Sequence, residues 1–318
     1  MKYGLGIDTS CYMTSVALCA LEGSSVFDSR RPVRVAAGER GVRQQEALFQ
    51  HVGSLGEAME DLMGQAGYPQ LAYVCVSAQP RPVAGSYMPV FTAGENMGRC
   101  LAAALHIPFY RTTHQEGHLA AGAWSCNPDK PSGAYLALHL SGGTTEIVRA
   151  EEGADGSVGI ELLGGTSDLS IGQLLDRVGV KLGFPFPAGR YMDELAGQAS
   201  GSPEIPSSVR GLSCSLSGAE NAAMRAIAAG NAPEAVARGA LICAARTVEK
   251  LIRNAAEQTG LAQALIAGGV GASQFLRAQL SKRMARSGIR LYFADPRWTG
   301  DNALGAALIG RQRYLSEY

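Results

Sequence analysis

Residues 3–19 read YGLGIDTSCYMTSVALC, and this stretch decides the fold. The short apolar run 3–7 is followed by the turn-like residues 8–10 and then by a second apolar run, 14–19. Two such runs joined by a small polar turn predict a β-hairpin.

The same pattern returns in residues 134–150, AYLALHLSGGTTEIVRA, as a strand, a Ser/Gly/Thr turn at 141–145 and a return strand. Apolar spacing after each hairpin predicts further helices and strands. The expected helices cover residues 44–63, 96–105, 171–182, 233–258, 273–284 and 303–314, and the expected strands cover 72–76, 107–110, 158–163 and 264–267, with a last strand that ends at 292–293. We therefore expect a duplicated α/β architecture with a cleft between its halves.

Length and composition exclude several classes of protein. The chain has 318 residues, 46% of them hydrophobic and 18% charged, which suits two packed domains or one large one. No apolar run approaches the ~20 residues that a membrane span needs. The formal net charge of zero disfavours a stand-alone nucleic-acid binder, but it allows an RNA substrate delivered in part by a partner. Seven scattered cysteines without a CxxC pair, and no signal peptide, indicate a cytoplasmic protein with reduced thiols.

A histidine pair is the sharpest local signal. Thr113 and Glu116 have the spacing of a capping box, which would start a helix. His114 and His118 then lie at positions i and i+4 of one helical face, where two imidazoles can share a metal ion. The position of Glu116 does not match the H-E-x-x-H pattern of zinc proteases. A buried histidine pair without metal remains the alternative, and a third ligand must come from elsewhere.

Asp301 precedes the expected helix at 303–314. It either caps that helix or offers a free carboxylate to the cleft. The residues alone do not say which group is the third ligand of the histidine pair, although a carboxylate would suit iron or zinc. His51, His106 and His139 are isolated in the sequence and are interpreted as structural.

Two hairpin turns have the composition of phosphate cradles, because small residues let backbone N–H groups approach anionic oxygens. The first contains Asp8 and Ser10, and the second is 141–145. Gly268 and Gly269 follow a buried strand and open a helix, a context that fits close approach to a nucleotide. Ordinary glycine- and serine-rich turns are the alternative for each.

Together these motifs resemble the tRNA threonylcarbamoyladenosine transferases, formerly described as O-sialoglycoprotein endopeptidases. The resemblance spans residues 5–310 and rests on segments 6–11, 114–119, 140–145, 172–176, 187–189, 216–218, 267–270 and 301–302. It implies an α/β fold of the duplicated, two-lobe actin/sugar-kinase/Hsp70-like ATPase type with an interlobe cleft. We expect a first lobe at 1–110, joined by the C-terminal segment 295–318, and a second lobe at 111–294 that carries the His-x-x-x-His helix.

The resemblance also assigns site residues. It implies that His114, His118 and Asp301 hold one divalent metal ion, iron or zinc. It implies that an ATP- or AMP-type nucleotide or acyl-adenylate is bound by residues that the family shares, namely His139, Leu140, Ser141, Gly142, Gly143, Asp176 and Gly189, and by Ser273, where the family usually has Asn. The turn residues Asp8, Ser10, Gly268 and Gly269 join this expected nucleotide set. No protein nucleophile is expected, since acyl transfer from a mixed anhydride needs mainly positioning and a Lewis acid.

The implied activity is transfer of a threonylcarbamoyl group from its adenylate to the exocyclic amine of the adenosine beside the anticodon in ANN-decoding tRNA. The implied partners are a smaller paralogous protein and a P-loop ATPase. Tyr12, Met13, Thr144, Ser273 and the loop 78–86 depart from the family pattern. A regulatory or non-enzymatic paralogue that binds nucleotide and metal is therefore an alternative. A metallopeptidase is a weaker one, because no general base lies at protease spacing from the histidines.

Overall fold

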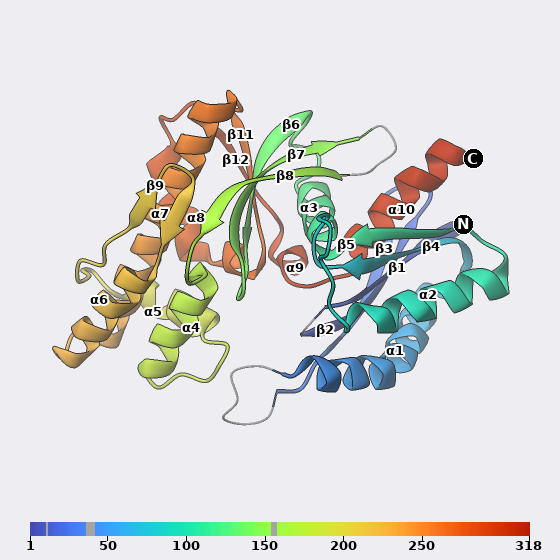
Figure 1. Ribbon diagram of the computed structural model, residues 1–318, viewed down its shortest axis with the longest axis horizontal. Coiled ribbons are helices and arrows are strands. Elements are labelled where there is room, and N and C mark those ends of the chain that lie inside the picture. The colour runs from blue at the N-terminus through green and yellow to red at the C-terminus, as the bar shows by residue number, and fades with distance from the viewer. Residues whose placement is uncertain (11, 36–41, 154–157) are drawn as a thin grey trace. The chain divides into compact units, whose positions relative to one another are not determined.

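The computed structural model describes residues 1–10, 12–35, 42–153 and 158–318 (Figure 1). Cys11, the last residue of the N-terminal motif, lies outside the described residues. The chain forms two compact units. Unit 1 comprises Met1–Trp124, Glu152–Ile160 and Gly300–Tyr318, and unit 2 comprises Ser125–Glu151 and Glu161–Thr299.

Unit 1 is built on a five-stranded sheet in the order β3-β2-β1-β4-β5. Its strands are β1 (Lys2–Thr9), β2 (Met13–Ala20), β3 (Val26–Pro32), β4 (Gln70–Gln79) and β5 (Phe109–Thr113). The predicted hairpin is the antiparallel pair β1–β2, while β1, β4 and β5 run parallel. The carboxyl ends of these three strands therefore meet at one edge of the sheet, where α/β proteins bind their ligands.

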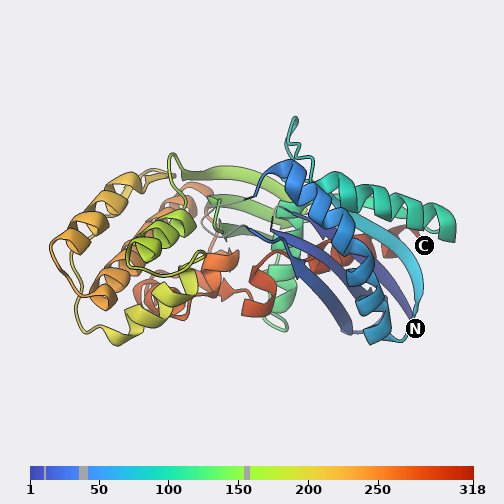
Figure 2. The same ribbon diagram turned by 90° about the horizontal axis from the view of Figure 1, so that it is seen from below.

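Helices cover both faces of this sheet. Helices α1 (Gln44–Ala66) and α2 (Phe91–Leu105) lie on one face, and α10 (Leu304–Glu317) lies on the other (Figure 2). Successive strand residues point to opposite faces, so the buried Leu5 and Ile7 of β1 pack toward α1 and α2. Burial on both faces explains why β1 is apolar or glycine along nearly its whole length.

The sheet of unit 2 has the order β12-β11-β6-β7-β8-β10-β9. Its strands are β6 (Ala134–Leu140), β7 (Thr145–Glu152), β8 (Val158–Thr166), β9 (Ser208–Arg210), β10 (Ser213–Ser215), β11 (Gln263–Ala267) and β12 (Arg290–Phe293). The run β8-β7-β6-β11-β12 repeats the order β3-β2-β1-β4-β5, with an antiparallel β6–β7 hairpin and parallel β6, β11 and β12. The predicted duplication is confirmed.

The helices of unit 2 are α4 (Ile171–Lys181), α5 (Gly189–Gln198), α6 (Ser217–Ala228), α7 (Pro233–Thr259), α8 (Gln274–Met284) and α9 (Pro296–Thr299), with the short 3₁₀ turn η1 (Gly269–Ala272). The alanine-rich α7 runs through the core beside α5, α8 and the sheet. Among the described residues, no helix has both the length and the apolar character of a membrane span.

The units divide the chain differently from the expected lobes. The histidine pair lies on helix α3 (His114–Ser125). All but the last residue of α3 belongs to unit 1, whereas the expected second lobe, 111–294, includes this helix. The reason is a close contact between α3 and α10: a Cβ placed on Gly305 would lie 1.8 Å from the Gly117 carbonyl oxygen, so the two helix backbones touch. This contact is long-range and has no periodic signal in the sequence.

Six elements were not expected from the pattern, namely β3, α5, α6 and the short β9, β10 and α9. The edge strand β3 contains the sequence DSRR and lacks strand-like apolar alternation. Helices α5 and α6 are short and are flanked by Gly-, Pro- and Ser-rich stretches that indicate loops. The expected strand at 107–110 is β5, displaced to Phe109–Thr113.

Candidate functional site

Helix α3 begins immediately after β5 because of a capping box. The Thr113 N–H donates to Glu116 Oε2 at 2.7 Å, and the Glu116 N–H donates to Thr113 Oγ1 at 3.2 Å. These reciprocal bonds satisfy two N–H groups at the helix start. The capping box predicted from the spacing is confirmed, and it places His114 at the first position of the helix.

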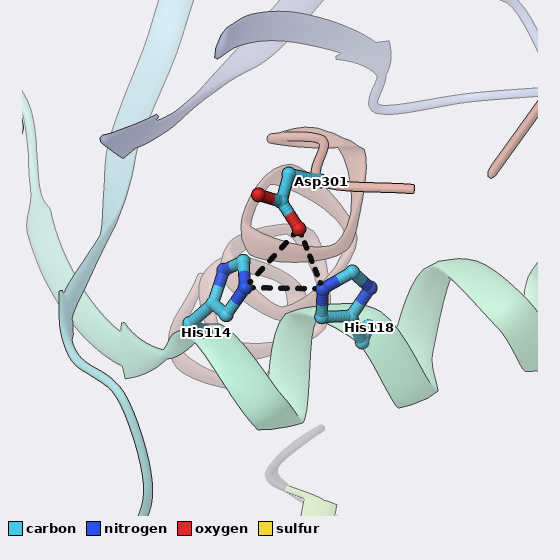
Figure 3. Close-up of side chains that lie close together, drawn as sticks. All are labelled: His114, His118 and Asp301. Carbon is cyan, nitrogen blue, oxygen red and sulfur yellow. Dashed lines mark hydrogen bonds and ion pairs between the residues drawn. The ribbon is translucent and has the colours of Figure 1, made fainter. Parts of the chain in front are cut away.

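The structure brings His114, His118 and Asp301 together within unit 1 (Figure 3). The two Nε2 atoms lie 3.0 Å apart, and Asp301 Oδ1 lies 3.5 Å from His114 Nε2 and 3.3 Å from His118 Nε2. A tetrahedral ion with bonds of 2.0–2.1 Å separates its donor atoms by about 3.3 Å. The three donors therefore have the chemistry and the spacing of a two-histidine, one-carboxylate metal site.

Two further polar side chains hold the candidate ligands in place. The buried Asp8, at the end of β1, lies with Oδ2 2.8 Å from His114 Nδ1, and its Oδ1 accepts the Ser10 N–H at 3.1 Å. The Ser10 hydroxyl donates to Asp301 Oδ2 at 2.7 Å. The carboxylate on Nδ1 fixes the ring of His114 so that Nε2 points toward His118 and Asp301.

Electrostatics in this cluster favour its charged forms. Burial by itself lowers the pKa of His114, but the carboxylates of Asp8 and Asp301 raise that pKa well above its ordinary value. Burial likewise tends to raise the pKa of Asp301, whereas hydrogen bonds and attraction from His114 and His118 hold that pKa well below its ordinary value.

Asp8 and Ser10, which are expected to bind nucleotide, have His114 and Asp301 as side-chain partners in the structure. A buried carboxylate is also unfavourable beside a phosphate. The sequence carried a usable signal, since the carboxyl ends of parallel strands meet at one sheet edge. Asp8 lies near the end of β1 and His114 follows β5, so both lie at that edge.

In unit 2, the hairpin turn after β6 is closed by its own serine. The Ser141 N–H donates to the Thr144 carbonyl at 2.9 Å, and the Thr144 N–H donates to Ser141 Oγ at 3.0 Å. The Ser170 hydroxyl, which caps α4, donates to the Gly142 carbonyl at 2.7 Å. The exposed Gly142 and Gly143 thus form the tip of a braced turn.

The backbones of two glycines lie in close contact with this turn. A Cβ on Gly172 would lie 2.4 Å from the Ser141 carbonyl oxygen. A Cβ on Gly268 would lie 2.3 Å from the Leu140 carbonyl oxygen. Gly268 also has a φ of +89°, which residues with side chains rarely adopt. The predicted residues Leu140–Gly143 and Gly268–Gly269 are therefore neighbours.

The other expected nucleotide residues lie in unit 2 with different partners. Asp176 Oδ1 accepts the Ala188 N–H at 2.7 Å at the start of α5, so Asp176 and Gly189 are brought together, and burial raises the pKa of Asp176. Ser273 caps α8 and donates to Asp193, which the sequence analysis missed. Asp193 also accepts the N–H groups of residues 274 and 275 at 3.0 Å each. His139 is buried within β6.

Solved structures similar to this chain share its fold. A HypF of T. kodakarensis has 14% sequence identity and a TM-score of 0.64, with 99% of this chain and 48% of that chain covered. A ROK family glucokinase from Streptomyces griseus, in complex with glucose and AMPPNP, has 12% identity and a TM-score of 0.53, with 96% and 98% covered. At this identity the likeness concerns the fold alone, which is the duplicated actin/sugar-kinase-like ATPase fold, as expected.

Sequence relatives identify the family. A tRNA N6-adenosine threonylcarbamoyltransferase of Prochlorococcus marinus (strain MIT 9303) is 32% identical, with 96% of this chain and 90% of that protein covered. A protein of the same name from a Polaromonas species is 32% identical, with 97% and 90% covered. The family model "TsaD: tRNA N6-adenosine threonylcarbamoyltransferase" matches residues 25–308. The chain belongs to the tRNA N6-adenosine threonylcarbamoyltransferase family.

Proposed function

We propose that this protein transfers a threonylcarbamoyl group from its adenylate to N6 of the adenosine beside the anticodon in ANN-decoding tRNA, with one divalent metal ion. Family membership supports the tRNA transferase activity. The observation that carries the metal dependence is the spacing of 3.0–3.5 Å among the donor atoms of His114, His118 and Asp301. Iron and zinc both suit two imidazoles and a carboxylate.

The chain's own residues would hold the metal and set its surroundings. His114 and His118 would bind the ion through Nε2, and Asp301 would bind it through Oδ1. Asp8 would orient His114, and Ser10 would orient Asp301, through their hydrogen bonds. When bound, the ion would supply Lewis acidity toward phosphate and carbonyl oxygens of the substrate. The His118 ring is almost fully buried, so its position is set by packing before any ligand binds.

Removal of the Asp8 carboxylate should weaken metal binding. We expect Asp8→Asn to lower zinc affinity about 10- to 100-fold, the usual cost of losing the hydrogen-bond partner of a metal-bound histidine. Zinc affinity is measured by competition with a chelator. Asp61→Asn, which removes a surface carboxylate bonded to Ser29 and Arg31, is the matched control and should bind zinc as the unmodified chain does. Equal affinity of the Asp8 variant would contradict the assigned role.

For the nucleotide, we propose the braced turn of residues 140–143 with Gly268, Gly269 and Ser273, together with His139, Asp176 and Gly189. Their support is the backbone packing around the turn and the tip that Gly142 and Gly143 expose. Backbone N–H groups at such a glycine tip are suited to anionic oxygens.

A methyl group at Gly172 should damage this turn. Because its Cβ would lie 2.4 Å from the Ser141 carbonyl oxygen, Gly172→Ala must displace the turn, and we expect ATP affinity to fall at least about tenfold. Isothermal titration with ATP measures the loss. Gly197→Ala in α5, where nothing lies within 4 Å of the added carbon, is the control. Unchanged ATP binding in the Gly172 variant would place the nucleotide elsewhere.

The complete activity is tested by reconstitution. Threonylcarbamoyl-adenylate, unmodified ANN-decoding tRNA, the smaller paralogous partner and the P-loop ATPase are combined with this chain, and a family member with all motifs intact is the positive control. We propose a cytoplasmic reaction with these partners. Modified nucleoside would show that Tyr12, Met13, Thr144 and Ser273 are tolerated changes. No product beside a working control would favour the non-enzymatic paralogue, whose metal and nucleotide binding would persist.

A further inference from the structure

His51 is a buried polar side chain to which the proposed reaction assigns no part. It lies on α1 with no exposed surface. Its Nδ1 lies 2.8 Å from Thr14 Oγ1 at the start of β2. Its Nε2 is also buried and has no hydrogen-bond partner in the described part of the chain. Burial of an unpartnered ring nitrogen costs free energy, so His51 is a candidate for a role beyond packing.

The partner of His51 belongs to the hairpin that carries Asp8 and Ser10. Thr14 pairs with Thr9 across the β1–β2 ladder, directly beside the turn. The next residue, Ser15, points to the opposite face of the sheet and accepts the Ala303 N–H at 2.8 Å. Strand β2 is therefore bonded on one face to His51 and on the other to a residue two positions after Asp301.

The imidazole also lies within the electrostatic reach of the site. Burial lowers the pKa of His51, and the Ser10 backbone and the Asp8 carboxylate partly offset that effect. The ring therefore lies near Asp8 and Ser10, the two residues that contact His114 and Asp301.

We propose that His51 is a positioning residue of the metal site: through its bond to Thr14 it holds the β1–β2 turn, so that Asp8 meets His114 and Ser10 meets Asp301. The inference rests on the proposed metal site and goes beyond it, since His51 itself contacts none of the three ligands through a hydrogen bond. A side chain on α1 thereby sets the geometry of ligands on α3 and beside α10.

Two substitutions of His51 distinguish the roles of its two ring nitrogens. An asparagine amide reaches the place of Nδ1 and can keep the bond to Thr14, whereas a glutamine amide reaches the place of Nε2 and cannot. We expect His51→Gln to weaken zinc affinity about tenfold, within the range for indirect supports of a metal ligand, and His51→Asn to stay close to the unmodified chain. We also expect the visible spectrum of the Co²⁺-loaded protein to change in His51→Gln but not in His51→Asn.

The controls distinguish positioning from general destabilisation. Thr14→Val removes the partner of His51 and should reproduce the zinc affinity of His51→Gln, while the double variant should lose no more than either single one. His106→Gln, which alters an exposed histidine at the end of α2, should bind zinc normally. Near-ultraviolet circular dichroism confirms that each variant is folded at the assay temperature.

Wild-type zinc affinity and an unchanged Co²⁺ spectrum in folded His51→Gln and Thr14→Val would overturn the inference while leaving the metal site intact. Equal loss in His51→Asn and His51→Gln would also overturn it, because the bond to Thr14 would then be irrelevant. If the unmodified protein binds neither Zn²⁺ nor Co²⁺, the proposed metal site itself fails. That result is separate from a specific effect of His51.

Discussion

His114→Ala is expected to release the metal ion and to reduce threonylcarbamoyl transfer to below about 1% of the unmodified activity, while the protein stays folded. The substitution removes one of three ligands and leaves Asp8 and Asp301 as two carboxylates without the imidazole between them. Loss of a metal ligand is among the largest effects that a single side chain can have on a metal site. Metal content after gel filtration, measured by elemental analysis, is the first readout.

The fold should survive because His114 lies at the edge of the core. Its side chain is 17% exposed, and the capping box of α3 uses Thr113 and Glu116 rather than the imidazole. His106→Ala is the matched control, since that residue lies outside the cluster. Stoichiometric metal in His114→Ala would refute the assignment of His114 as a ligand.

Gly305→Ala is expected to destabilise unit 1 by about 3 kcal/mol or more, at the upper end of the cost of overpacking a core. A Cβ on Gly305 would lie 1.8 Å from the Gly117 carbonyl oxygen, so helices α3 and α10 would have to separate. His114 and His118 lie on α3, and Asp301 precedes α10. The same displacement should therefore lower zinc affinity as well as the melting temperature.

Gly56→Ala in α1 is the control for this prediction. Nothing lies within 4 Å of the Cβ that the substitution adds. In a helix interior, alanine is more stabilising than glycine by about 0.5–1 kcal/mol of folding free energy. It should raise the melting temperature slightly and leave zinc binding unchanged. If Gly305→Ala kept both the stability and the zinc affinity of the unmodified chain, the close approach of α3 and α10 would not be needed to form the cluster.

Much of the architecture could be predicted because it depends on local spacing. The two hairpins, the capping box at Thr113 and Glu116, and the i, i+4 placement of His114 and His118 each involve residues a few positions apart. Such patterns are determined by helix and strand periodicity. The edge strand β3 was missed because its sequence lacks that periodicity.

The arrangement around the metal ligands was harder to predict. Asp8 and Ser10 have the composition of a phosphate-binding turn, and composition does not reveal which side chain they meet. The grouping of α3 with unit 1 had no signal in the sequence for a related reason, since it depends on a glycine contact with α10. Asp193 gave no sequence signal because its partners lie on α8, distant in the chain.

The sequence by itself determined the duplicated α/β framework and the pairing of two histidines on one helical face. The family resemblance named Asp301 as the third ligand, and the tertiary structure brings it to the two histidines. Only the tertiary structure decided that Asp8 and Ser10 contact these residues and that His51 bonds to the strand behind them. Local patterns follow from backbone geometry over a few residues. Contacts between distant segments depend instead on how closely backbones can pack, as at Gly117 and Gly305, and no short-range period records that.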